Sequence, residues 1–346
     1  MWDSEKSKEF EPKFVLSLVN FLAELGVSDI YLSLGHPMMA RYRGEVRGVE
    51  RVLEEVVAKR GEETKELAPV LDRIRKEREL LTYTFVTYIA KNLWALQQVD
   101  SRYLSPLFAK RAMDVGLSLH RGYRARVHAF FSQAYLLGGE MVPEAMTEEE
   151  WYRIASALRY TIRIVPPIPN SIEELGLTPS LETQFLTQKG LYLIVGPTAS
   201  GKTTTAAYLV QSTATKKPWH ILTLEDPIEY LIHSQVSSGG ALVHQREKGR
   251  DFQTFAEGME QALRQSPDLI FVGEVRDVET LNWTLFLAEA GFTVIGTYHS
   301  SSFIETLQKV VASFPPEQRE LASKRLGSVL RAVVAQRLVG TKGACA

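Results

Sequence analysis

The sequence predicts an α/β protein of two domains, a larger C-terminal one built on a parallel sheet and a smaller α+β one before it. The chain has 346 residues, more than a single hydrophobic core usually serves. Three prolines fall within residues 166–169, and proline continues neither a helix nor a central strand. From residue 176 on, short apolar runs alternate with helical patterns, which favours a parallel sheet with crossover helices. We therefore predict domains over 1–165 and 176–346, joined by a linker over 166–175.

The N-terminal domain is expected to combine helices with short strands. Apolar residues recur at helical spacing over residues 12–26. Alternating patterns predict strands over residues 28–35, 38–46, 114–120 and 123–131. A glycine-bearing turn separates the last two runs and indicates a hairpin. Residues 51–98 are dense in charges of both signs, and we interpret them as an insertion of solvated amphipathic helices.

The C-terminal domain is predicted to contain four buried parallel strands. Each is a short continuous apolar run, as expected of a strand covered on both faces. The runs are residues 191–196, 220–225, 268–274 and 293–299. Thr178 and Pro179 suit the cap and first turn of a helix that Gly190 would end. Further helices are predicted over residues 254–265 and 278–290, the second one capped by Asp277 and closed by Gly291.

Composition and charge argue against several functional classes. Forty Lys and Arg against 41 Asp and Glu give a net charge of −1, so no overall positive field favours nucleic acid. The one cysteine, Cys345, allows neither an intrachain disulfide nor a Cys-cluster zinc site. The charged N-terminus has no signal-peptide core, and no apolar run reaches the length of a membrane span. We expect a cytoplasmic protein with no direct membrane insertion and no nucleic-acid partner.

The segment "GPTASGKT", residues 196–203, matches the phosphate loop G-x-x-x-x-G-K-[ST]. It follows one predicted strand and opens a helix, which is the context that phosphate binding requires. Lys202 would reach the β- and γ-phosphates of ATP, and the Thr203 hydroxyl would bind Mg²⁺. The predicted ATP-binding residues are Gly196, Pro197, Thr198, Ala199, Ser200, Gly201, Lys202, Thr203 and Thr204.

Polar residues follow the other three strands, at the edge where ligands of open α/β sheets bind. Glu225 with Asp226, Glu274 and His299 occupy these positions. Phosphoryl transfer needs both a bound metal and a positioned water, and two acids on neighbouring strands can supply both. We assign Glu225 to activating water and Glu274 to the Mg²⁺ side through metal-bound water, although spacing alone does not decide between them. An isolated His299 would usually be structural, but beside a phosphate loop we count it as catalytic.

Four segments together resemble the boxes of the secretion ATPases that drive type II secretion and type IV pili. They are "GPTASGKTTT", "ILTLEDPIEY", "LRQSPDLIFVGEVRD" and "GTYHSSS", similar to the Walker A, Asp, Walker B and His boxes in that order. The tail "FPPEQRELASKRLGSVLRAVVAQRL" resembles the PilT-type pilus-retraction ATPases. This resemblance implies a RecA-like ATPase domain behind a PAS-like N-terminal domain, and a homo-hexamer that works on an inner-membrane pilus or secretion platform.

The resemblance also implies roles for single residues. Glu225 matches the catalytic base of the Asp box, and Gly273 before Glu274 is normal in the family. N-terminal arginines approach the phosphates there, and the matching positions are Arg124 and Arg126, with Arg163 a weaker candidate.

Some positions depart from the family pattern. Ala199 replaces a usual glycine, a change that suits the loop if its φ is negative. Lys309 replaces a usual arginine, "TYHSSS" replaces "TLHTNSA", and the sequence ends before the retraction-associated C-terminal motif. One alternative is therefore a type IVB secretion or conjugation ATPase of the DotB/TraJ kind. Others are a weakly hydrolysing regulatory paralogue in a mixed ring and a small-molecule kinase.

Overall fold

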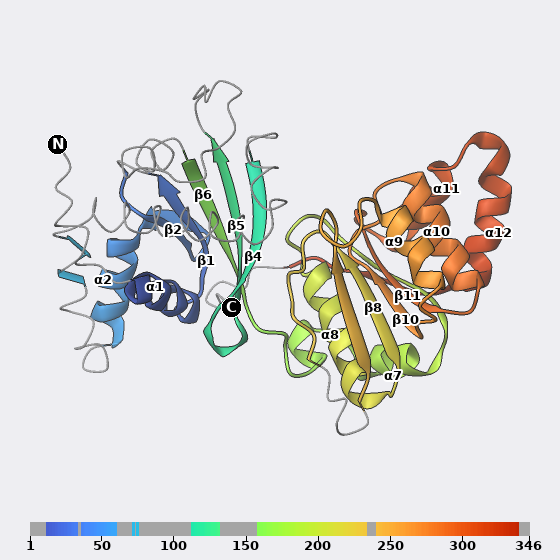
Figure 1. Cartoon of the computed structure of the whole chain (residues 1–346), viewed down its shortest axis with the longest axis horizontal. Coiled ribbons are helices and arrows are strands. Elements are labelled where there is room, and N and C mark those ends of the chain that lie inside the picture. Colours follow the sequence, from blue (N-terminus) through green and yellow to red (C-terminus); the bar gives the residue numbers. More distant parts are fainter. Residues whose placement is uncertain are drawn as a thin grey trace, which may run out of the picture. The chain divides into compact units, whose positions relative to one another are not determined.

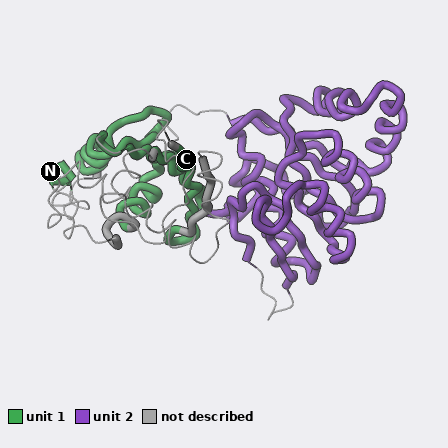
Figure 2. Tube along the Cα trace, turned by 45° about the horizontal axis from the view of Figure 1, so that its top comes forward, with its two compact units in different colours: residues 1–166, 343–346 green, residues 167–342 purple. Residues whose placement is uncertain are grey.

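The computed structural model describes residues 12–33, 36–60, 71–72, 74–75, 112–131, 158–233 and 240–338. The chain divides into two compact units, with the break between Pro166 and Pro167 (Figure 2). Most of the predicted charged insertion over 51–98 lies outside the described residues.

Unit 1 contains a six-stranded sheet in the order β3-β2-β1-β6-β5-β4, with every described strand pair antiparallel. Helices α1 and α2 pack on it (Figure 1). In chain order its elements are α1 (Pro12–Glu24), β1 (Val27–Ser33), β2 (Met39–Tyr42), β3 (Glu45–Gly48), α2 (Val49–Arg60), β4 (Ala112–Ser118), the short helix η3 (His120–Gly122), β5 (Arg124–Phe131) and β6 (Leu158–Val165).

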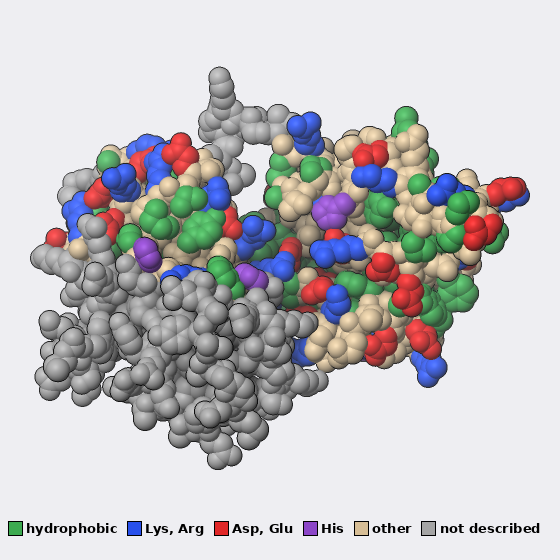
Figure 3. Space-filling view, turned by 90° about the horizontal axis from the view of Figure 1, so that it is seen from above, with side chains coloured by type: hydrophobic (Ala, Val, Ile, Leu, Met, Phe, Trp, Pro, Cys, Tyr) green, Lys and Arg blue, Asp and Glu red, His purple; other side chains and the backbone are tan. Residues whose placement is uncertain are grey.

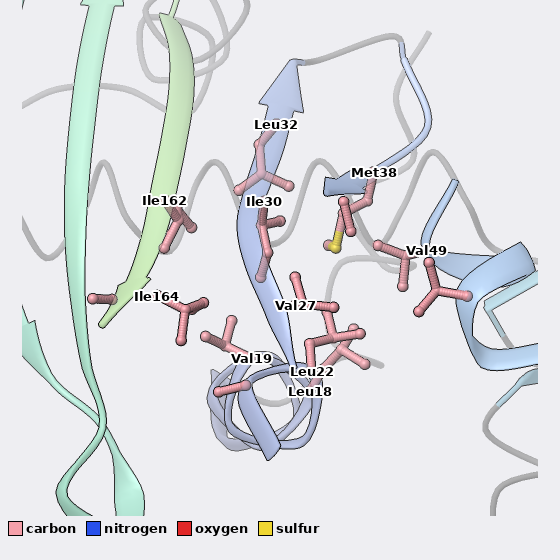
Figure 4. Close-up of a cluster of buried hydrophobic side chains, with 14 of the residues drawn as sticks. Leu18, Val19, Leu22, Val27, Ile30, Leu32, Met38, Val49, Ile162 and Ile164 are labelled. Carbon is pink, nitrogen blue, oxygen red and sulfur yellow. The ribbon is translucent and has the colours of Figure 1, made fainter. Parts of the chain in front are cut away.

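The core of unit 1 lies between these helices and one face of the sheet. Leu18 and Leu22 of α1 pack with Ile30 of β1 and Ile162 of β6 (Figure 4). Along β5 the alternate residues Ala125, Val127 and Ala129 are buried in the same core. Because strand side chains alternate between faces, Arg124 and Arg126 share the opposite face of β5.

Two sequence predictions in unit 1 can be compared with the strands. The hairpin is confirmed, since β4 and β5 pair antiparallel across η3. The single strand predicted over 38–46 is wrong, because β2 and β3 form a hairpin of their own. Its turn is Arg43–Gly44, with φ of 53° and 83°. Positive φ at both central residues matches the twist of the flanking strands in a two-residue hairpin.

Unit 2 is a parallel six-stranded sheet in the order β12-β7-β11-β10-β8-β9, so the predicted α/β fold with a parallel sheet is confirmed. Its elements are η4 (Glu173–Leu175), α7 (Pro179–Thr187), β7 (Gly190–Val195), α8 (Lys202–Lys216), β8 (His220–Glu225), β9 (Leu242–Glu247), α9 (Phe255–Leu263), β10 (Leu269–Val272), α10 (Val278–Glu289), β11 (Thr293–Tyr298), α11 (Phe303–Ala312), η6 (Pro316–Gln318), α12 (Arg319–Val329) and β12 (Leu330–Ala335).

Helices cover both faces of this sheet and create two cores. Strand β7 shows the arrangement, because Leu191 and Leu193 face the core under α9–α12 while Tyr192 and Ile194 face the core under α7 and α8. Figure 1 shows these two groups of helices on opposite sides of the strands. All residues of β7 are therefore buried, which explains its continuous apolar sequence.

Several predicted helix boundaries need correction. Thr178 precedes α7 but makes no side-chain capping bond, and its hydroxyl lies 2.8 Å from Ser180 Oγ instead. Gly190 does not end α7, since the helix stops at Thr187 and Gly190 is the first residue of β7. Asp277 does cap α10, accepting a 2.7 Å bond from Thr280 N, and Gly291 follows the helix with φ of 93°.

The surface charge of the described residues is mixed. On the face drawn in Figure 3, basic and acidic side chains are interspersed on each unit. Among the described residues, no helix is long and apolar enough to cross a membrane.

Candidate functional site

The sheet of unit 2 brings the predicted site residues to one edge. Strands β7, β8, β10 and β11 are parallel, so their carboxyl ends meet at the same edge. The phosphate loop follows β7, Glu225 ends β8, Glu274 follows β10, and His299 follows β11. Strands β11 and β10 lie between β7 and β8. The loop and Glu225 are therefore far apart in strand order, although a ligand lying across this edge can contact both.

The loop is packed closely against the end of β12. A Cβ added at Gly196 would lie 2.3 Å from Ser200 Oγ and 2.4 Å from the Gln336 carbonyl oxygen, so only glycine fits there. Gln336 also donates a 2.8 Å bond to Thr205 Oγ1 of α8. Ser200 Oγ is buried and has no hydrogen-bond partner among the described residues. A buried hydroxyl without a partner is costly, so a ligand oxygen at this position would stabilise it.

Ala199 has a φ of +58°, so the condition under which alanine would suit this loop, a negative φ, is not met. In this left-handed region a Cβ comes close to the neighbouring carbonyl oxygen, which disfavours residues other than glycine. The sequence places alanine where the loop backbone favours glycine, and the loop keeps its left-handed turn nonetheless.

Lys202, the first residue of α8, is buried and bonds to the loop itself. Its ammonium donates to the carbonyl oxygens of Gly196 and Pro197, at 3.0 and 2.7 Å. Burial lowers the pKa of Lys202, while the negative charges of Glu274 and Glu229 act to raise it. Both acids therefore lie close enough to Lys202 for their fields to matter. Glu229 was not among the predicted site residues.

Glu225 is a buried carboxylate held by neutral donors. It is 4% exposed. Its Oε1 accepts bonds from Thr223 Oγ1 at 2.7 Å and Gln245 Nε2 at 3.0 Å. Burial raises the pKa of Glu225 to about 7, although both donors act to lower it. A carboxyl group with a pKa near neutrality can take up and release a proton under physiological conditions, as a general base must.

Glu274 has two nitrogen-bearing neighbours, Arg276 and His299, that line an open hollow. Arg276 Nε and His299 Nε2 lie 2.5 and 3.0 Å from Glu274 Oε1. Neither contact has the geometry of a hydrogen bond, so Oε1 has no hydrogen-bond partner among the described residues. Burial raises the pKa of Glu274, but Arg276 and His299 outweigh it and the pKa is lowered overall. The hollow encloses about 500 Å³ and is lined by Glu274, Val275, Arg276, Tyr298, His299 and Lys309.

The glycine before Glu274 has a packing reason. A Cβ on Gly273 would lie 3.0 Å from the Leu224 carbonyl oxygen and 3.2 Å from Glu225 Cα. Gly273 N donates to the same Leu224 oxygen at 2.8 Å. The ends of β8 and β10 therefore approach one another so closely that a side chain at Gly273 would push Glu225 away.

The candidate arginines belong to unit 1. Arg126 pairs with Arg163 across β5 and β6, so their side chains share one face of the sheet. Arg163 Nε donates a 3.0 Å bond to Oδ1 of Asp29, which is 6% exposed. Arg163 therefore has a structural partner, and that contact favours a role in the fold over a role at the phosphates.

Sequence reasoning missed Gln245, Tyr230 and Arg276. Gln245 reaches Glu225 only through the pairing of β8 with β9, a strand that was not predicted. Tyr230 OH lies 2.8 Å from Thr204 Oγ1 in the first turn of α8. Arg276 lies near the end of the segment "LRQSPDLIFVGEVRD", two residues after Glu274. This short spacing could have indicated a contact between the two side chains.

Residues 143–346 match the family described as "Type II/IV secretion system protein". The chain belongs to this family. It is 32% identical over 326 residues to the "Type IV pilus retractation ATPase PilT" of Pseudomonas aeruginosa, covering 94% of this chain and 78% of that protein. The expected relationship to secretion ATPases is thereby confirmed.

Solved structures show the same fold. The structure described as the pilus retraction motor PilT with bound ADP matches with a TM-score of 0.66 at 27% identity, over 95% of this chain and 79% of that one. The ATPase DotB of Legionella pneumophila matches with a TM-score of 0.64 at 24% identity, over 96% and 78%. At that identity the second match is evidence for the fold alone.

The residues of the edge fit a nucleotide and Mg²⁺. The loop offers a buried, unpartnered hydroxyl, a lysine and the N-terminus of the 15-residue helix α8. Mg²⁺ prefers oxygen ligands and commonly uses one or two carboxylates together with substrate phosphates. No group of three or more His, Cys, Asp or Glu able to hold a metal occurs in the described part of the chain. A Mg²⁺ site of this kind would combine side-chain oxygens of the edge with the phosphates of a bound nucleotide.

Proposed function

We propose that this protein is a motor ATPase that hydrolyses ATP at the carboxyl edge of the unit 2 sheet and powers retraction of a type IV pilus. One observation carries the proposal. A phosphate loop with its lysine and a buried carboxyl of pKa about 7 emerge from the same edge of one parallel sheet. The family of the chain and its similarity to PilT over most of both chains agree with it.

The loop residues bind the phosphates and Glu225 serves as the base. Residues 196–204 surround the β- and γ-phosphates, and Lys202 exchanges its loop carbonyl contacts for phosphate oxygens. Ionised Glu225 takes a proton from a water whose oxygen bonds to the γ-phosphorus. The bond from that phosphorus to the bridging oxygen breaks, and ADP and phosphate leave.

Thr203 and Glu274 are the residues that would hold Mg²⁺, Glu274 through a metal-bound water. When bound, Mg²⁺ neutralises negative charge on the β- and γ-phosphate oxygens. His299 lies beside Glu274 and holds that carboxylate at the edge of the hollow.

The larger assembly is part of the same proposal. The protein would form a homo-hexamer at the cytoplasmic face of the inner membrane, held there by a pilus platform protein. The N-terminal unit would be PAS-like, and its Arg124 and Arg126 would approach the ATP phosphates. The second candidate is a type IVB secretion or conjugation ATPase of the DotB/TraJ kind, since this chain shares its fold with DotB.

The test is ATP turnover by the purified protein beside its Glu225→Gln variant. Loss of a general base lowers rates by about 100-fold or more, while ATP binding should remain because the loop is untouched. Equal rates in the two proteins would overturn the assignment of Glu225. In cells lacking the gene, lost twitching motility with intact secretion supports pilus retraction, and the reverse result supports the secretion candidate.

A further inference from the structure

We infer that Gln245 of β9 is a positioning residue, which orients the Glu225 carboxylate and ties it to the segment that follows β8. The inference rests on the proposed function, because it assumes that Glu225 is the base. It adds a residue that the four boxes do not contain.

The contact between the two residues is built into the sheet. Thr223 and Gln245 are paired in the parallel register of β8 and β9. Both side chains donate to the same oxygen, Glu225 Oε1, at 2.7 and 3.0 Å. Two donors converging on one oxygen fix the plane of the carboxyl group, and its remaining oxygen is thereby oriented as well.

The amide of Gln245 is fully engaged. Besides Glu225, its Nε2 donates to the Tyr230 carbonyl oxygen at 2.8 Å, and its Oε1 accepts from Ile232 N at 2.8 Å. A rotated amide would place its oxygen against the Glu225 carboxylate, which is unfavourable, so the three bonds select one orientation. The hydroxyl of Tyr230 lies 2.8 Å from Thr204, two residues after Lys202. One side chain therefore connects the base to a segment that also contacts the first turn of α8.

Gln211 of α8 provides a control, because it holds the segment after β8 without contacting Glu225. Its Nε2 donates to His233 O and its Oε1 accepts from His233 N, both at 2.9 Å. Gln211 thus holds the same segment by an equivalent pair of amide bonds, but those bonds go to His233 and not to Glu225.

The charged surroundings of Glu225 determine the direction of the expected pH effect. Burial raises its pKa to about 7, the charge of Glu229 raises it as well, and the bonds from Thr223 and Gln245 lower it. At the end of β9, Glu247 accepts from Ile228 N, and the next residue, Lys248, pairs with Asp226 at 3.0 Å. After β10 the residue next to Glu225 is the uncharged Gly273. Removing the Gln245 donor therefore shifts the Glu225 proton equilibrium toward the neutral acid, which cannot act as a base.

The experiment measures ATP turnover against pH, from about pH 6 to 9, for wild type and for Gln245→Met, Thr223→Val, Gln211→Met and Glu225→Gln. In Gln245→Met the pH at which turnover falls to half on the acid side should rise by at least about 0.5 pH unit. Part of the lost rate should be regained at high pH. Thr223→Val should move this midpoint in the same direction, and it leaves the contacts of the segment after β8 unchanged. Gln211→Met should keep the wild-type midpoint.

The outcomes separate the two claims. A wild-type midpoint in Gln245→Met, or an equal shift in Gln211→Met, overturns the positioning role. If Gln245→Met does not fold, an unshifted Thr223→Val profile overturns it instead. If Glu225→Gln retains wild-type turnover, then the base assignment itself fails. An inactive Glu225→Gln with an unchanged Gln245→Met profile rejects only the inference about Gln245.

Discussion

Ala199 lies in the phosphate loop and has a left-handed backbone, with φ of +58°. The residues around it keep the turn in place. Gly196 is pressed against Gln336 at the end of β12, and the Lys202 ammonium bonds to two loop carbonyls. These contacts hold the loop in its shape although alanine disfavours that backbone, and the strain is stored at the residue next to Ser200.

Replacing Ala199 with glycine should stabilise the protein. The left-handed backbone costs alanine about 1–2 kcal/mol. Glycine avoids this cost, but its greater freedom in the unfolded chain destabilises the folded state by about 0.4–1 kcal/mol. We therefore expect Ala199→Gly to raise the free energy of unfolding by about 0.5–1 kcal/mol, measured by urea denaturation. The control is Ala312→Gly at the right-handed C-terminal end of helix α11, where glycine should lower the free energy of unfolding by less than about 1 kcal/mol. Similar losses in both variants would show that Ala199 is not strained.

At the scale of secondary structure, the sequence predicts central strands well and edge strands poorly. The predicted runs correspond to β7, β8, β10 and β11, which lie inside the sheet and are buried except for the half-buried end residues His220 and Tyr298. Strand β9 is an edge strand, and its sequence LVHQRE mixes exposed and half-buried residues, so it has no continuous apolar run. β12, at the other edge, is likewise mostly half-buried.

The same limit explains what could be predicted of the site. The phosphate loop, Glu225 and Glu274 are readable because each follows an apolar run directly. The partners of Glu225 are less accessible to sequence reasoning. Gln245 is 20 residues away along the chain and reaches Glu225 only because β9 pairs with β8 in one register. Local patterns do not encode the pairing partner of an edge strand, so its contribution to the site needed the structure.

Two glycines in different elements should respond oppositely to the same added methyl group. Gly327 lies within α12, where a Cβ would meet open space. Gly327→Ala should raise the free energy of unfolding by about 1 kcal/mol, because alanine favours the helix and restricts the unfolded chain. At Gly196 the same methyl group would meet Ser200 and Gln336 below 2.5 Å.

We therefore expect Gly196→Ala to lower both the thermal midpoint and the affinity for ATP, measured by calorimetry and by titration with a fluorescent nucleotide. Unchanged ATP affinity in this variant would contradict the close packing of the loop against β12.

At the scale of the whole molecule, the two units contribute different chemistry. Unit 2 provides the phosphate loop and the acids, whereas the candidate arginines lie in unit 1, on the sheet face opposite the buried side chains of β5. Arg126 and Arg163 are directly paired there, and like charges opposite one another destabilise a sheet. Asp29 offsets this repulsion at Arg163, with Arg41 Nε 3.5 Å from its other carboxylate oxygen. The same pair of strands thus contains Arg163, which pairs with the buried Asp29, and Arg126, which we propose acts on phosphates.

Substituting these two arginines should separate folding from turnover. Arg163→Gln removes the positive charge that pairs with the buried Asp29 carboxylate. Because the arginine is itself partly exposed, the free energy of unfolding should fall by only about 1 kcal/mol. Arg126→Gln should lower ATP turnover by about 10-fold or more, because the neutral amide no longer stabilises negative charge on the phosphates. Thermal denaturation and ATP turnover measured on both variants test these two roles. If Arg126→Gln lowers stability and leaves turnover intact, or if Arg163→Gln does the reverse, the roles of the two residues must be exchanged.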